Sequence, residues 1–144
     1  MPAPEGVELR FPEDGGCFGC SPSNATGLRL TFRRAGAQVE SRCTIPDRFH
    51  GAPGIAHGGI VATALDEISC AAAVFLLDRY VVTGELTVRY HHPVPVERPL
   101  VLEAEVVSQN HSRYVEIEGR VLHETTLLAR STGKFFYKER PAIP

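Results

Sequence analysis

The feature that most constrains this fold is an alanine-rich, apolar stretch from Ile60 to Leu77. Its residues are apolar on nearly every side of a helix, and a helix of that kind is buried all round instead of lying on a surface. Asp66 and Glu67 lie near the middle of the stretch, and charges at that depth argue against a membrane span. The rest of the chain is therefore expected to wrap around one buried helix.

Alternating apolar and polar residues on both sides of this helix predict the strands that cover it. Two strands precede the helix and four follow it, at residues 28–33, 39–45, 85–90, 100–107, 115–121 and 127–137. One helix wrapped by a curved antiparallel sheet of about six strands is an α+β fold. Residues 1–27 are rich in proline, glycine and serine and predict an irregular lead-in. Residues 28–144 then form one domain, since a chain of this length suits a single core.

Composition and charge narrow the possible functions. The formal net charge is −2, whereas a nucleic-acid-binding protein usually has a basic face, so we expect no nucleic-acid partner. The N-terminus lacks the positive start and apolar run of a secretory signal. We therefore expect a cytoplasmic protein that does not bind a membrane.

Cys17 and Cys20 have the spacing of half a zinc site, and a structural zinc site needs two more ligands. The sequence has no second pair with this spacing, so His50 and His57 would complete a site only if the fold recruited them. A redox pair would need to open a helix after a strand, and Pro22 disfavours that helix. We expect a turn-rich loop with small buried thiols and no metal.

The candidate catalytic residues lie in the loop at residues 46–59, which is rich in proline and glycine, and in the helix that follows it. Gly58 and Gly59 open the helix with bare backbone N–H groups, where the helix dipole places partial positive charge. Such a position can hold a developing oxyanion. Asp66 and Glu67 are successive residues and diverge by about 100° around the helix axis. We expect one carboxylate to be catalytic and the other to have a structural or polar-pocket role.

The spacing of these groups also predicts an assembly. Gly58 and Asp66 are eight residues apart, which is roughly 12 Å along a helix axis. An oxyanion donor and a nucleophile must each lie within about 3 Å of atoms of one carbonyl group. One helix alone cannot meet this requirement, whereas two antiparallel copies related by a two-fold axis can. We therefore expect a homodimer with two equivalent sites, and a homotetramer as a further assembly.

The motif His57-Gly58-Gly59, followed seven positions later by Asp66, resembles the signature of the hotdog-fold acyl-CoA thioesterases, in the phenylacetyl-CoA-thioesterase-like branch. The segment Cys17-Phe-Gly-Cys20 and the residues after it are similar to a lead-in that is common in one branch. The order of strands matches as well, so the resemblance covers most of the chain.

The resemblance implies roles for individual residues. The aspartate matching Asp66 acts as nucleophile or general base, and the N–H matching Gly58 polarises the thioester carbonyl. A hydroxyl on the strand after the helix, here Thr83, helps to place water. Some relatives have an asparagine in the loop before the motif, where this chain has His50 and Gly51, and His50 is a candidate substitute. The implied substrate is a coenzyme A thioester, with no metal cofactor.

The candidate site has four catalytic residues and four substrate-binding residues: Asp66, Gly58, His57 and Thr83, and then Gly59, His50, Glu67 and Thr63. We expect His57 to fix the loop by a hydrogen bond more than to transfer a proton. Arg89, Arg113 and Lys134 are candidate contacts for the coenzyme A phosphates, with a solvated strand position as the alternative.

Together these features predict hydrolysis of an acyl-CoA to the free acid and coenzyme A. Two alternatives stay open. A hydratase or dehydratase on the same fold generally pairs a histidine with an acid in a different arrangement, which we do not find here. A non-catalytic acyl-CoA sensor usually carries a DNA-binding segment, and the lead-in has no helical pattern that would supply one.

Overall fold

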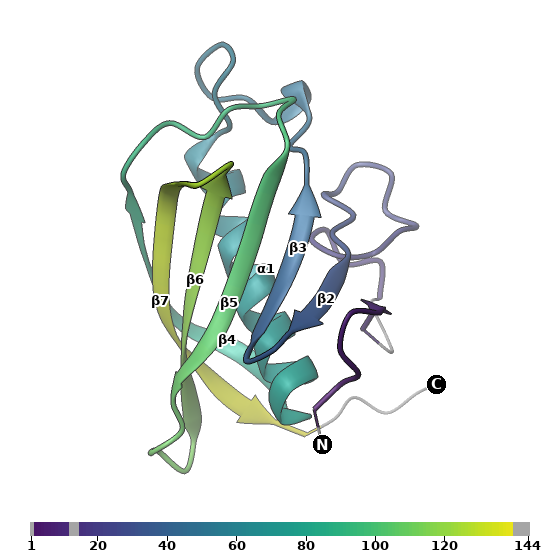
Figure 1. Cartoon of the computed structure of the whole chain (residues 1–144), viewed down its shortest axis with the longest axis vertical. Coiled ribbons are helices and arrows are strands. Elements are labelled where there is room, and N and C mark those ends of the chain that lie inside the picture. The colour runs from purple at the N-terminus through teal and green to yellow at the C-terminus, as the bar shows by residue number, and fades with distance from the viewer. Residues whose placement is uncertain (1, 12–14, 140–144) are drawn as a thin grey trace.

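The computed structural model describes residues 2–11 and 15–139, and its main features are one long helix and one sheet. The helix, α1 (Gly58–Leu77), is wrapped by a curved antiparallel sheet (Figure 1). Seven strands form the sheet: β1 (Glu8–Leu9), β2 (Phe32–Ala35), β3 (Gln38–Cys43), β4 (Tyr80–Tyr90), β5 (Leu100–Ser108), β6 (Tyr114–His123) and β7 (Thr126–Lys138). A short 3-10 helix, η1 (Asp47–Phe49), lies in the loop before α1. The predicted α+β hotdog arrangement is confirmed.

The order of strands in the sheet places β4 at an edge. Neighbouring strands follow the order β1-β2-β3-β5-β6-β7-β4, so β4 pairs with β7, and β1 ends the opposite edge. Within the described residues, no strand covers the second side of β4. The strand that directly follows the helix is therefore open along its length.

The core lies between α1 and the concave face of the sheet. Helix residues such as Leu65 and Ile68 are fully buried, and they meet inward-facing strand residues such as Leu102, Ile117 and Phe135. Burial of side chains of this size stabilises the fold by about 1.5–3 kcal/mol each. The length and composition of α1 would also suit a membrane span, but in this fold the sheet covers much of that apolar surface.

The first predicted strand is shorter than expected. The alternation of residues 28–33 predicted a continuous strand, but β2 begins only at Phe32. Arg29 has a left-handed backbone, with φ of 53°. The N–H of Leu28 donates to the Phe18 carbonyl at 2.8 Å. This segment thus bonds to the lead-in instead of to a strand, although its leucines still face inward.

The lead-in is more ordered than predicted, because it adds strand β1 to the sheet and makes seven strands instead of six. The N–H of Ala3 donates to the carbonyl of Phe75 at 2.8 Å, near the end of α1. The ring of Phe11 lies 5.3 Å from that of Phe75, centroid to centroid. The predicted segments 1–27 and 28–144 also include residues 1, 12–14 and 140–144, which lie outside the described residues.

An ion-pair network on the outer face of the sheet, the face turned away from α1, centres on Arg120. Its Nε lies 2.8 Å from Glu103 and one of its terminal nitrogens lies 3.1 Å from Glu105, and it also contacts Glu118. Only 14% of the Arg120 side chain is exposed. Without this guanidinium, Glu103 and Glu105 would lose their cation, and Glu118 would keep only its contact with Arg130.

We predict that Arg120→Ala lowers the free energy of unfolding by about 2 kcal/mol or more, because it leaves uncompensated, partly buried carboxylates. The matched control is Arg42→Ala, whose exposed side chain lies 3.9 Å from Glu40 and should cost less than about 0.5 kcal/mol. Urea unfolding followed by circular dichroism measures both changes. Equal losses in the two variants would contradict the proposed importance of the network.

Candidate active site

The N-terminus of α1 is built from His57, Gly58 and Gly59. The helix begins at Gly58, so the two glycines open it as the sequence predicted, and His57 is its N-cap. The Nδ1 atom of His57 accepts a hydrogen bond from the N–H of Gly59 at 2.9 Å, which is the loop-fixing contact expected for this histidine. The N–H of Gly58 has no acceptor among the described residues. One exposed helix N-terminal donor is therefore available to a ligand.

Tyr90, at the end of β4, is a site residue that the sequence analysis did not single out. Its hydroxyl donates to the Gly58 carbonyl at 2.6 Å. Its ring lines a surface pocket of about 400 Å³ together with Gly58, Val61 and Pro93. The sequence could have indicated this residue, because the alternation of Leu86, Val88 and Tyr90 places the Tyr90 side chain on the helix-facing side of the strand.

Asp66 and Thr83 lie together, as the resemblance implies. The hydroxyl of Thr83 on β4 donates to Oδ1 of Asp66 on α1 at 2.5 Å. Asp66 is half-buried, and Thr83 is exposed at the open edge of the sheet. The hydrogen bond fixes the orientation of the carboxylate.

A β-bulge turns Thr83 toward Asp66. Thr83 lies opposite Phe135 and Leu86 lies opposite Gly133, so both face the helix although they are three residues apart. The register shift between Thr83 and Glu85, at Gly84, accounts for this. Strict alternation from Leu86 would place the Thr83 side chain on the outer face. One extra residue in the strand therefore determines whether the two catalytic candidates meet.

Cys70, one turn after Asp66, is the nearest sulfur to this pair. Its Sγ lies 3.8 Å from the Thr83 hydroxyl. Burial, with the negative charges of Asp66 and Glu67 adding to it, raises the pKa of the Cys70 thiol to about 12. The thiol is therefore protonated at neutral pH and is a poor nucleophile. Asp66 is the more reactive group at this position.

The predicted substrate-binding residues are spread over the N-terminal half of the helix and its loop. The Thr63 hydroxyl donates to the Gly59 carbonyl at 2.9 Å. His50 is exposed, and its Nδ1 lies 2.7 Å from the Asp47 carbonyl oxygen. Glu67 points away from the Asp66–Thr83 pair and lies against the lead-in, and burial raises its pKa while the thiol of Cys20 opposes part of that shift. Contact of these residues with a substrate stays a prediction.

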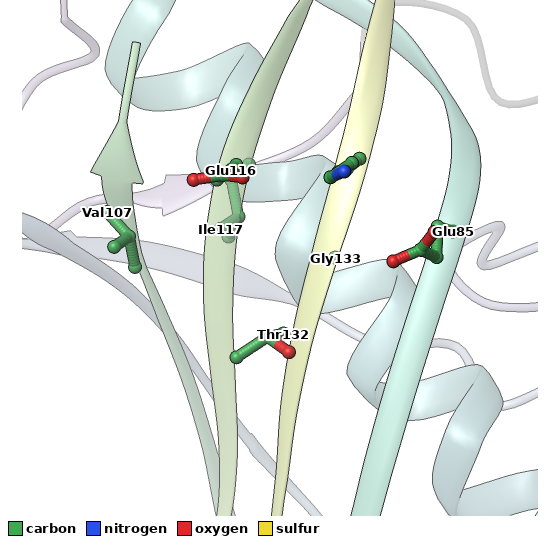
Figure 2. A pocket seen from close by; sticks show the side chains of 7 residues that line it. Glu85, Val107, Glu116, Ile117, Thr132 and Gly133 are labelled. Atoms are coloured by element: carbon green, nitrogen blue, oxygen red, sulfur yellow. The ribbon is translucent and has the colours of Figure 1, made fainter. Parts of the chain in front are cut away.

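A separate depression of about 250 Å³ lies across β5, β6, β7 and β4, with α1 behind the sheet (Figure 2). Glu85, Glu116 and Thr132 are among the residues that line it. Lys134, a candidate phosphate contact, also lines it, and its Nζ lies 5.4 Å from the centre of the Tyr114 ring. This depression is distinct from the Asp66–Thr83 pair, whose side chains meet on the helix side of the sheet.

Comparison with known proteins places this chain in a family. Residues 53–129 match the model of the thioesterase superfamily. The chain belongs to the thioesterase superfamily. The matched segment includes the helix N-terminus, Asp66 and Thr83, and it leaves out only His50 among the predicted site residues.

Individual known proteins are also similar to this chain in sequence or in fold. The chain is 30% identical over 93 residues to acyl-coenzyme A thioesterase THEM4 of Xenopus laevis, a match that covers 65% of this chain and 38% of the relative. The chain thus spans less than half the length of this curated relative. A solved thioesterase superfamily protein is 26% identical with a TM-score of 0.74, covering 79% of this chain and 59% of the other. A Streptococcus mutans protein solved with acetyl-CoA has a TM-score of 0.70 at 17% identity, covering 78% and 91% of the two chains.

We predict that Gly84→Ala destabilises the bulge by about 1–3 kcal/mol, because the added Cβ would lie 2.3 Å from the ring of Phe136. Phe136→Leu should relieve part of the clash. In a double-mutant cycle measured by urea unfolding, the double variant should then lose less stability than the sum of the single variants, by about 0.5 kcal/mol or more. Additive losses would show that the ring does not restrict position 84.

Proposed function

We propose that this protein hydrolyses an acyl-CoA thioester to the free acid and coenzyme A, in the cytoplasm and with no further cofactor. The observation that carries the proposal is the Thr83–Asp66 hydrogen bond beside a helix whose first N–H is unpaired among the described residues. The relative from Xenopus laevis is named an acyl-coenzyme A thioesterase, and the Streptococcus mutans structure contains acetyl-CoA. Both support a coenzyme A thioester as substrate.

Two routes of hydrolysis suit the geometry. In the first, Asp66 attacks the thioester carbonyl, the C–S bond breaks with release of coenzyme A, and water then hydrolyses the mixed anhydride. In the second, Asp66 takes a proton from a water molecule, and that water attacks the carbonyl directly. The Gly58 N–H stabilises the oxyanion in both routes, and a single donor of this kind contributes about 100-fold to 1000-fold in rate.

The site needs a second copy of the chain. Gly58 and Asp66 both lie in α1, eight residues apart, or about 12 Å along the axis. We propose that two chains associate about a two-fold axis and bring Gly58 of one copy beside Asp66 of the other. The open edge of β4, where Val82 and Tyr90 are each 49% exposed, supports this side of the fold as the interface. Such dimers would associate further into a tetramer.

The acyl group is proposed to occupy the pocket beside Gly58. Its volume of about 400 Å³ is within the range of about 300–1,000 Å³ that small-molecule sites usually have. Apolar and aromatic side chains, including Val61, Tyr90 and Pro93, line it. These walls favour a compact apolar acyl group, such as an arylacetyl group, over a charged one.

We predict that Asp66→Asn lowers thiol release from the best substrate at least about 100-fold, because the amide can act as neither nucleophile nor base. The assay follows free thiol from a panel of aromatic, short-chain and medium-chain acyl-CoAs. Asp78→Asn makes the same chemical change at the exposed C-cap of α1 and should leave the rate unchanged.

Two results would contradict the proposal. An Asp66→Asn variant as active as the wild type would remove Asp66 from the chemistry. A wild type that binds acyl-CoA but releases no thiol from any member of the panel would instead indicate a sensor.

Gly58→Pro provides a direct test of the shared site. Proline removes the N–H but suits the first position of a helix, and the extended His57 backbone (φ −58°, ψ 135°) tolerates a following proline. We predict that Gly58→Pro and Asp66→Asn are each nearly inactive, whereas co-expression of the two recovers about a quarter of wild-type activity if chains pair at random. Gly58→Ala keeps the N–H and should remain active. Failure of the mixture to regain activity would contradict a site shared between chains.

A further inference from the structure

A second cluster of reactive side chains lies where the lead-in contacts α1. It consists of Cys17 and Cys20 in the lead-in and Glu67 on the helix, and their two sulfurs and one carboxylate oxygen all lie within 4.8 Å of one another. The Sγ of Cys17 is 3.7 Å from Oε1 of Glu67. All four cysteines of the chain are free thiols. The cluster joins residues that are about fifty positions apart in the sequence.

The loop that carries the two cysteines is bent around the first sulfur. The N–H of Gly19 donates to the Sγ of Cys17 at 3.3 Å, and the N–H of Ser21 donates to the Cys17 carbonyl at 3.0 Å. The turn therefore presents both sulfurs to the same point in space.

Gly19 allows the carboxylate to reach this point. A Cβ at position 19 would lie 2.6 Å from the carboxylate of Glu67, so any larger residue would displace it. The N–H of Leu30 donates to the Gly19 carbonyl at 2.9 Å and holds the loop from the opposite side. The loop is therefore held close enough to α1 for the carboxylate of Glu67 to lie near both sulfurs.

Among the residues that the structure describes, no positively charged side chain is paired with the cluster. Glu67 takes part in none of the described ion pairs, although it is half-buried and Cys20 is only 7% exposed. A buried carboxylate without a cation is unfavourable. A divalent cation would compensate the carboxylate and both thiolates together.

We propose that Cys17, Cys20 and Glu67 bind one Zn²⁺ ion, with water in the fourth position. Tetrahedral zinc with bonds of about 2.3 Å to sulfur and 2.1 Å to oxygen separates a sulfur from an oxygen by about 3.6 Å, close to the distance between Cys17 and Glu67. Binding releases the thiol protons of both cysteines to solvent and leaves two thiolates on the metal. The ion ties the lead-in to α1 at the residue next to Asp66.

This proposal replaces the expectation of no metal, which considered only cysteines and histidines as further ligands. The structure brings neither His50 nor His57 into the cluster. It supplies Glu67, which local spacing could not reveal as a partner of Cys17 and Cys20. The zinc site does not depend on the proposed hydrolysis, since it uses none of the proposed catalytic side chains and is measured without substrate.

The test uses the full chain, reduced, stripped with a chelator and then titrated with Zn²⁺ alone. Elemental analysis after gel filtration should give one zinc per wild-type chain, and added Zn²⁺ should raise Tm. Substitution with Co²⁺ should produce a thiolate-to-cobalt charge-transfer band. Cys43→Ser is the matched control, because Cys43 is a half-buried thiol outside the cluster; it should bind zinc as the wild type does.

Cys17→Ser and Cys20→Ser should lose the ion and the charge-transfer band. Glu67→Gln keeps the shape of the side chain and tests the site if the cysteine variants fail to fold. This variant should bind zinc at least about tenfold more weakly. Loss of a residue that only supports a metal ligand can weaken binding by that factor, and Glu67 is proposed as a ligand itself. The proposal is overturned if the wild type holds no zinc after titration and gel filtration, if Cys43→Ser loses as much zinc as Cys17→Ser, or if Glu67→Gln binds with unchanged affinity.

Discussion

The whole structure depends on the burial of one apolar helix that also carries a carboxylate. Most of α1 must be covered, because its alanine-rich surface gains stability only away from water, and the curved sheet provides that cover. Asp66 cannot be covered in the same way without a partner for its charge. The fold meets both requirements, since the sheet ends at β4 and Thr83 on that edge strand supplies the hydrogen bond. The reactive group therefore lies where the core meets the open edge.

A single irregularity in β4 connects this edge to the chemistry. From Leu86 to Tyr90, alternation directs side chains toward the helix and places the Tyr90 hydroxyl on Gly58. The bulge at Gly84 shifts the alternation of inward and outward side chains by one residue. Thr83 therefore also faces the helix and reaches Asp66. Strand β4 thereby contacts both Gly58 and Asp66, which are separated along α1. With regular alternation, the strand would contact Gly58 through Tyr90 but would not bring Thr83 to Asp66.

The sequence predicted the parts of this arrangement that are encoded locally. The all-round apolar helix, the glycines at its start, the spacing to Asp66 and the alternation of the later strands all appear within short windows of the chain. Contacts that depend on the tertiary fold were not predicted. Strand β1 is too short to show a period, and Leu28 follows a strand pattern while bonding to a loop. Glu67 meets Cys17 only because the lead-in folds back onto the helix.

The position of β4 also has a consequence for the order in which the protein becomes competent during synthesis. β4 follows α1 directly in the chain, yet its partner is β7, the last strand among the described residues. On the ribosome, helix and edge strand emerge together, but Thr83 has no strand to align it until residue 135 has left the exit tunnel. Pairing of strands so far apart in sequence is slow compared with helix formation. The Asp66–Thr83 pair is therefore expected to assemble only after β7 has been synthesised.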